Sequence, residues 1–188
     1  MRHRWALVLL GAWIAGSICT AIVAAENFYT IDRLLAHPAN AAFSSAVAAL
    51  GAPQARDLLR YLSSELNRLY FQLWSAAQLV LGVLALWLIA GHTRPDPRTA
   101  RAARVVAGML AIVVLMIAWL TPAIVSLGRE LDFVPRDPAP PGMQRFWILH
   151  ATYTSLETLK LAAGFFVAYW IAQAPGEAER AAVHGSAT

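Results

Sequence analysis

The sequence is poor in charged residues and in cysteine. Only 14% of its 188 residues are charged, whereas about 25% is usual for soluble domains. The single cysteine, Cys19, excludes an internal disulfide and any metal site made of several thiolates. The basic residues are almost all arginine and are dispersed, so the net charge of +4 forms no patch for a nucleic acid. We therefore predict no nucleic-acid partner.

Common catalytic and cofactor motifs are also missing. No glycine-rich phosphate loop, HExxH zinc motif or Gly-x-Ser-x-Gly elbow occurs, so the sequence favours a protein without enzymatic activity. A four-helix cytochrome with two haems needs paired histidines inside the membrane. Only His150 lies in an apolar stretch, since the other histidines fall in loops or tails: His3, His37, His92 and His184. We expect no cofactor, and His150 is the one candidate ligand for a metal or a single haem.

Hydrophobic residues make up 59% of the sequence and gather in four long stretches. A transmembrane helix needs about 20 mainly apolar residues, and residues 5–25, 70–90, 105–127 and 146–171 meet this requirement. Tryptophan and tyrosine near their ends suit the headgroup level of a bilayer. We predict an all-α bundle of four transmembrane helices in a single membrane domain, residues 1–173. A disordered cytoplasmic tail, residues 174–188, follows it.

The distribution of arginine predicts the orientation of this bundle. Arginines flank the first stretch at its N-terminus and fill the short second loop: Arg2, Arg4, Arg94, Arg98, Arg101 and Arg104. Short cytoplasmic loops are enriched in basic residues, so we place both termini in the cytoplasm. The abundance of arginine and alanine over lysine suggests the inner membrane of a GC-rich bacterium. A signal peptide cleaved after Ala25 is the alternative, but the apolar run exceeds the usual h-region of about 7–15 residues, which favours a retained helix.

Two connections differ from plain loops. In the first, Gly51-Ala52-Pro53 interrupts the chain, and leucines then recur at helical spacing: Leu58, Leu62, Leu66 and Leu69. This pattern predicts an extra amphipathic helix in the outer first loop, which either lies on the membrane or continues into the second span. The proline-rich third loop, VPRDPAPPGMQ, is expected to be irregular.

The fourth stretch carries ionisable residues at membrane depth. Glu157 is 11 residues past Phe146, or about 16 Å along a helix, close to the middle of a bilayer. A charged group there costs roughly 2.5–3.5 kcal/mol on insertion scales, so it usually faces the bundle interior. Helical spacing places a set of polar side chains on one stripe: His150, Tyr153, Thr154, Glu157 and Lys160. This stripe is either an ion pair that holds the helix in place or a relay or cavity lining for protons, ions or a substrate.

A second polar set falls at the outer ends of the stretches. Its members are Glu26, Asn27, Glu65, Asn67, Arg68, Pro122, Arg129, Glu130 and Asp132. If the helices form a bundle, these groups converge into an outer polar vestibule. Ordinary interfacial residues and helix caps are the alternative explanation. Pro122 is expected to kink the third span, and Gln72 and Gln78 to form hydrogen bonds across the bundle.

Three segments resemble the four-helix membrane family of unknown function typified by transmembrane protein 205: LLGAWIAGSICTAIVAAENF, TPAIVSLGRELD and FWILHATYTSLETLKL. The resemblance covers most of the chain. The fourth helix of that family typically has a leading phenylalanine, then Leu-His-Gly, and an asparagine seven residues after the histidine. The matching residues here are Phe146, Leu149, His150, Ala151 in place of the glycine, and Glu157 in place of the asparagine.

The resemblance implies a four-helix membrane domain whose site is more acidic in this chain than in the family. The family is similar in architecture to copper-resistance D proteins and to a membrane protoporphyrinogen oxidase, in which helix histidines handle metal or haem. Only His150 could carry that role here.

Three functions remain open at this stage. The first is a small transporter or an ion- or proton-handling protein, with Glu157 as the titrating group, Lys160 as its counter-charge and His150 as the outer gate or ligand. The second is a haem- or metal-binding redox protein that uses His150, with Tyr153 nearby. The third is a non-catalytic membrane subunit or scaffold. The lipid bilayer is the predicted partner in each case, and assembly with further copies or other membrane subunits is left open.

Overall fold

A computed structural model describes residues 2–91 and 97–173, and every regular element in these residues is helical. The elements are α1 Arg2–Ala36, α2 Ala41–Leu50, α3 Ala52–Ala90, α4 Pro97–Leu115, the π-helix η1 Met116–Leu120, α5 Thr121–Glu130 and α6 Met143–Ala172. The all-α prediction is thereby confirmed. The predicted disordered tail, together with His92 and Arg94, lies outside the described residues.

Three helical segments are long and apolar enough to cross a membrane: Arg2–Ala36, Ala52–Ala90 and Pro97–Glu130. This confirms the prediction of a membrane protein. α6 has 30 residues but is not one of the three. Its apolar content is diluted by Glu157, Lys160 and a series of hydroxyl side chains.

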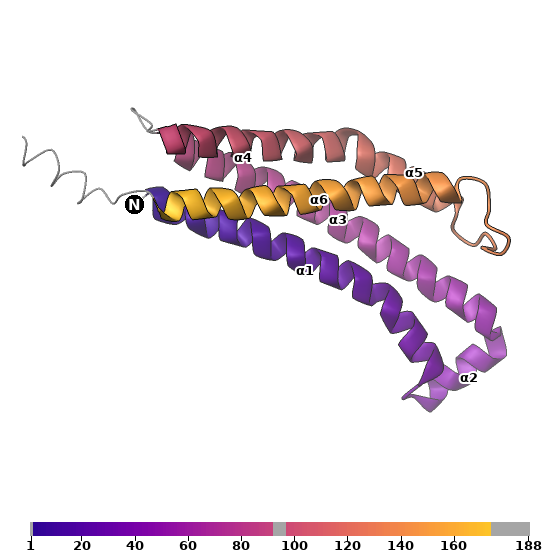
Figure 1. Ribbon diagram of the computed structural model, residues 1–188. Coiled ribbons are helices and arrows are strands. Elements are labelled where there is room, and N and C mark those ends of the chain that lie inside the picture. The colour runs from indigo at the N-terminus through magenta and orange to yellow at the C-terminus, as the bar shows by residue number, and fades with distance from the viewer. Residues whose placement is uncertain (1, 92–96, 174–188) are drawn as a thin grey trace, which may run out of the picture.

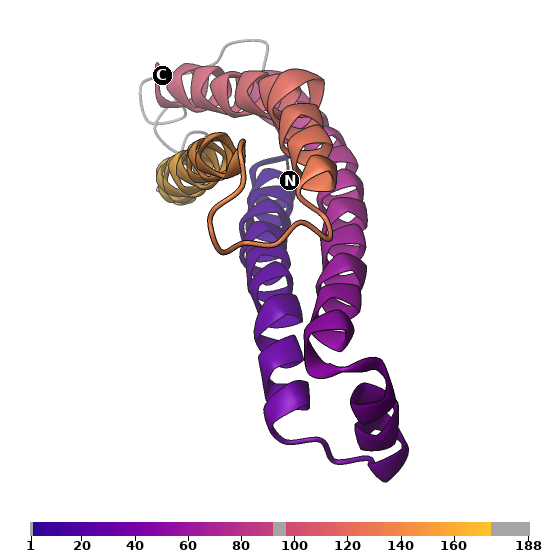
Figure 2. The same cartoon turned by 90° about the vertical axis from the view of Figure 1, so that its right-hand side faces the viewer.

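The long helices form a four-cornered bundle. α1 packs against α3, α3 against α4, α4 against α6 and α6 against α1, so that α3 and α6 face each other across a diagonal. In Figure 2, which looks nearly along α6, α4 lies above α6, α1 lies beside α6, and α3 lies on the other side of α1. The largest fully buried side chains come from all four helices, and all but one are apolar: Leu10, Gln78, Ile89, Val106, Val113, Leu120 and Val167. The core thus includes the first apolar segment, and cleavage after Ala25 would remove part of it.

α1 and α3 are much longer than a bilayer core is thick. With 35 and 39 residues, they extend roughly 50–60 Å, against about 30 Å of hydrocarbon. At the end of the bundle away from the N-terminus they run past α5 and α6, and α2 joins them there (Figure 1). The predicted amphipathic helix is therefore the first part of α3 and not a separate element. α1 ends at Ala36, shortly before Pro38, which disfavours helix in the preceding residue.

The third apolar stretch is not a uniform α-helix. Pro122 stands in the first turn of α5, directly after the π-helical turns of η1. A proline inside a helix lacks the N–H donor and clashes with the preceding turn, and a π segment is a usual way to absorb such a defect. The helix changes direction here, as predicted for Pro122 (Figure 1). The proline-rich connection to α6 is irregular, also as predicted.

Candidate functional site

A hydrogen-bonded polar network crosses the centre of the bundle. Lys160 Nζ lies 2.8 Å from Glu157 Oε1 and donates to Gln78 Oε1 of α3 at 2.6 Å. Trp13 Nε1 of α1 donates to the same Gln78 oxygen at 3.0 Å, and Gln78 Nε2 donates to Glu157 Oε1 at 3.4 Å. These four residues, called the central polar site below, join α1, α3 and α6.

Lys160 and Gln78, the buried part of the central polar site, are enclosed mainly by apolar side chains. Lys160 is 2% exposed and Gln78 1%. Around Lys160 lie residues of α1, α4 and α6: Leu10, Ile14, Met109, Leu161 and Gly164. Lys160 is the only lysine in the sequence. Its ammonium group is removed from bulk water and loses its hydration. The charged form of Lys160 is therefore stabilised by Glu157 and Gln78 instead.

Glu157 is the incompletely satisfied member of the site. Its Oε1 accepts from Lys160 and Gln78. Its Oε2 is buried and, among the described residues, has no hydrogen-bond partner. Buried polar atoms are nearly always paired, because an unpaired one loses its hydration without compensation. Oε2 is therefore the atom of this site that is best placed to receive a proton or a ligand atom.

Tyr153 closes the site on one side. It lies one helical turn from Glu157 on α6 and is buried with Met116 and Leu120 of η1. Its ring meets Phe71 of α3 edge-on, with 5.3 Å between the ring centroids. An apolar cluster thus separates Glu157 from the end of the bundle that carries α5 and the 131–142 connection, called the loop end below.

The structure does not bring His150 and Thr154 to the other residues of the predicted stripe. Both are exposed. The His150 ring stacks on Phe146 at 6.0 Å between centroids, and Thr154 Oγ1 donates to the backbone oxygen of His150. Leu149 packs inward in their place. Figure 1 shows that α1 diverges from α6 toward this end of the bundle.

Part of the predicted vestibule forms a second polar cluster at the loop end. Arg68 of α3 donates to Asp132 at 2.8 Å and forms an ion pair with Glu65. The side chains of Arg68 and Asp132 are only 10% and 14% exposed. Arg129 Nε of α5 lies 3.9 Å from Glu65 Oε1. These contacts tie α3 to the end of α5 and to the connection that follows it.

The remaining vestibule residues lie elsewhere. Asn27 of α1 donates to Asn67 of α3 at 2.6 Å, and Asn67 donates to the backbone oxygen of Ala24 at 3.0 Å. This pair seals the α1–α3 contact. Glu26 pairs with Arg33 on the exposed face of its own helix. Pro122 and Glu130 line a groove between α3 and α5, together with Arg129. The residues predicted to form one vestibule are thus distributed over several places at and near the loop end.

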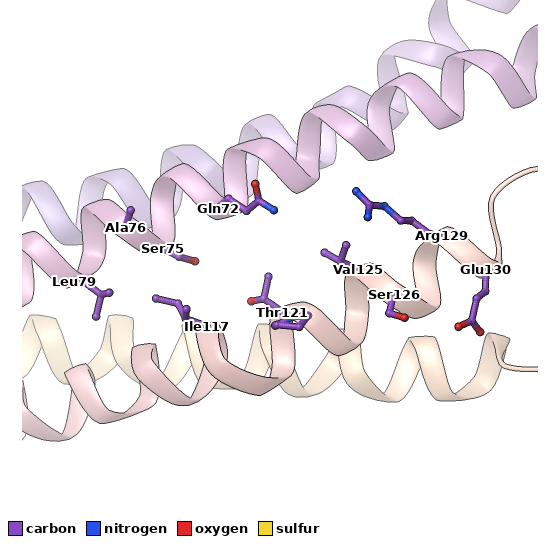
Figure 3. A pocket seen from close by; sticks show the side chains of 11 residues that line it. Gln72, Ser75, Ala76, Leu79, Ile117, Thr121, Val125, Ser126, Arg129 and Glu130 are labelled. Carbon is purple, nitrogen blue, oxygen red and sulfur yellow. The ribbon is translucent and has the colours of Figure 1, made fainter.

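The groove runs between α3 and η1–α5 and encloses about 850 Å³. Figure 3 shows its side chains, which come from α3 on one side of the opening and from η1 and α5 on the other. They are Gln72, Ser75, Ala76, Leu79, Ile117, Thr121, Pro122, Val125, Ser126, Arg129 and Glu130. Sequence reasoning missed this groove, although the kink expected at Pro122 was a sign that α5 separates from α3.

Trp13 was also missed as a site residue. It sits near the middle of the first apolar stretch, whereas membrane tryptophans concentrate at the interfaces. A buried indole N–H normally finds an acceptor, so a central tryptophan signals a polar partner on a neighbouring helix. Gln78, expected to bond across the bundle, is that partner.

No family model matches the sequence, and no curated protein or solved structure is significantly similar to it. The resemblance to the family of transmembrane protein 205 therefore stays a prediction, and function must be argued from the geometry of the site.

Replacing Arg68 by glutamine is expected to loosen the 131–142 connection. The change leaves the largely buried Asp132 without its charged partner and Glu65 with only the longer contact to Arg129, at a cost of roughly 1–3 kcal/mol. Hydrogen exchange of residues 131–142 should become faster. Arg33→Gln removes an exposed pair and should change the stability by no more than about 0.5 kcal/mol. Equal exchange in the two variants would show that Arg68 does not hold the connection.

Proposed function

We propose that α6 is a fourth membrane-spanning helix and that the protein is a four-span integral membrane protein. α6 has 30 residues and is about 45 Å long. It packs beside α1 and α4, and its two charged residues at this depth point inward. It exposes a series of large apolar or aromatic side chains: Trp147, Ile148, Leu159, Phe165, Phe166 and Tyr169. The topology agrees with the one implied by the family resemblance, which we retain as a hypothesis.

The arginines support an orientation with both termini in the cytoplasm of a bacterial cell. Five arginines lie on α1 and α4 at the end of the bundle that holds the N-terminus: Arg2, Arg4, Arg98, Arg101 and Arg104. Arginines also occur toward the loop end, where Arg68 is paired with Glu65 and Asp132. Arg2 contacts the backbone oxygen of Gly91, and its guanidinium lies 5.3 Å from the centre of the Trp87 ring. Such Arg–Trp clusters suit the headgroup level of a membrane.

Within this topology, the central polar site handles a proton or a cation as part of a small transporter. The observation that carries this function is the Glu157 carboxylate, which uses Oε1 for Lys160 and keeps a buried, unpartnered Oε2. A proton on Oε2 neutralises Glu157 and weakens its attraction to Lys160. Lys160 keeps Gln78 as an acceptor in that state. The charge of the site is thereby coupled to the contact between α6 and α3.

Access to Glu157 is controlled by aromatic rings in this proposal. Phe71 and Tyr153 meet across α3 and α6 on the loop-end side of the site. Exchange of a proton with that side requires the two rings to separate. The motion would be a small change of packing inside the bundle, of the kind by which transporters alternate access around a fixed site.

The proton-handling function is tested by flux measurements in proteoliposomes. The wild-type protein should dissipate an imposed pH gradient, read with an entrapped pH-sensitive dye. Glu157→Gln should slow the dissipation of the pH gradient by roughly 10²-fold or more, because the proton-carrying group is lost. Glu26→Gln is the control, since Glu26 is an exposed carboxylate away from the site. Equal rates in wild-type protein and Glu157→Gln would remove Glu157 from any relay.

A scaffold function is the second candidate, and it is favoured by the number of helices that the polar network joins. The central polar site joins three helices through four side chains, which is an effective way to fix their register. In that case Glu157→Gln combined with Lys160→Met should fold and function as the wild-type protein does. The redox alternative has less support, because His150 lies on the exposed face of α6 and the described residues hold no group of three metal-ligating side chains.

A further inference from the structure

The groove between α3 and η1–α5 has an apolar part and a polar end. Ala76, Leu79, Ile117 and Val125 provide apolar lining along its length. At the loop end Arg129 points toward α3, whereas Glu130 points away from it (Figure 3). The groove is thus shaped for a molecule with a long apolar chain and a polar head.

Two polar groups of the groove lack adequate partners within the described part of the chain. The Arg129 side chain is 62% exposed, and its one acidic contact, Glu65 Oε1 at 3.9 Å, already belongs to Arg68. Thr121, which lies between Ile117 and Val125 on the η1–α5 side of the groove, has a buried Oγ1 without a hydrogen-bond partner among these residues. A cation at the mouth of an apolar groove matches an anionic head group on a long apolar chain.

The length of the groove matches one leaflet of a bilayer. Its lining on η1 and α5 runs from Ile117 to Arg129, which is about 18 Å at 1.5 Å per residue. Half of the hydrocarbon core is about 15 Å thick. Ile117 and Leu79 therefore lie near the midplane when Arg129 lies at the headgroups.

We propose that this groove binds one phospholipid with an anionic head group. An acyl chain lies along Ala76, Leu79 and Ile117, and the phosphate pairs with Arg129. The proposal needs α3 and the α4–α5 segment to cross the bilayer. It is independent of proton handling at Glu157, so each can fail without the other.

The test measures which lipid stays with the protein. Purified protein is placed in nanodiscs of equal amounts of phosphatidylglycerol and phosphatidylcholine, released into mild detergent and analysed by native mass spectrometry. One lipid should remain per chain, with phosphatidylglycerol favoured about fivefold, the effect of one arginine at an anionic headgroup. Arg129→Gln should bring the ratio of the two lipids close to one.

Filling the groove should abolish retention altogether. Ala76→Phe fills the groove from the side of α3. If that variant does not fold, Val125→Phe fills it from the side of α5. The controls are Arg33→Gln, an arginine of equal exposure outside the groove, and Ala162→Phe on the exposed face of α6. Both should retain lipid as the wild type does. Wild-type protein without a bound lipid, or groove variants that retain it, would overturn the proposal, and equal retention of both lipids would overturn the role of Arg129.

Discussion

Replacing Lys160 by methionine is expected to destabilise the protein by about 3–5 kcal/mol. Methionine fills much of the space of the lysine stem but removes the charge that faces Glu157 Oε1 at 2.8 Å. The carboxylate, only 18% exposed, then remains in an apolar setting with Gln78 as its single donor. Thermal unfolding in detergent should show this as a midpoint lower by about 10 °C.

The double variant separates the charge effect from the packing effect. Glu157→Gln with Lys160→Met removes both charges, and uncharged replacements of a buried pair are often neutral or better. The double variant should recover most of the stability that Lys160→Met loses. In a double-mutant cycle with the two single variants, the coupling energy between Glu157 and Lys160 should therefore exceed about 2 kcal/mol. Thr158→Met places the same side chain on the exposed face of α6 and should change little. If Lys160→Met were as stable as the wild type, the Glu157 carboxylate would have to be solvated by water and not buried with Lys160.

The helical content and the membrane character could be read from the sequence because they depend on composition and length alone. The three confirmed stretches lie inside α1, α3 and the α4–α5 segment. The continuity of α3 could not be decided, because the leucine spacing after Pro53 is the same for a helix on the membrane surface and for one that continues into the span. Ser63 and Asn67 settle it, since both are buried against α1.

The site could be predicted only in part. Glu157 and Lys160 had to face the interior because of their desolvation cost in lipid, and they do. Which residues flank them depends on how α6 is rotated against each neighbour, and spacing along a single helix does not contain that information. His150 and Leu149 are adjacent and point about 100° apart on a helix, so the rotation of α6 about its axis decides which of them is buried. The groove depends on the π-helical turns of η1, which have no signature beyond Pro122.

Gly82 and Gly16 are predicted to be essential for the contact between α1 and α3. The ring of Trp13 lies over Gly82, where an added Cβ would come within 2.8 Å of two ring carbons. In the reciprocal arrangement the ring of Trp74 covers Gly16, and Trp74 Nε1 donates to Ser17 at 3.3 Å. Each helix therefore uses a glycine to admit a tryptophan from the other, in keeping with the small residues common at membrane helix contacts.

Gly82→Leu should destabilise the protein by about 3 kcal/mol, combining overpacking with loss of the Trp13–Gln78 hydrogen bond. Thermal unfolding should report the loss. Gly11→Leu is the matched control, because nothing lies within 4 Å of a Cβ there, and leucine is the better helix former by roughly 1 kcal/mol. Gly82→Ala should also destabilise the wild-type protein. This loss of stability should largely disappear in a Trp13→Leu background, because leucine leaves room for the added methyl group. A cost that persists there would locate the strain in the Leu110 contact and not in the indole.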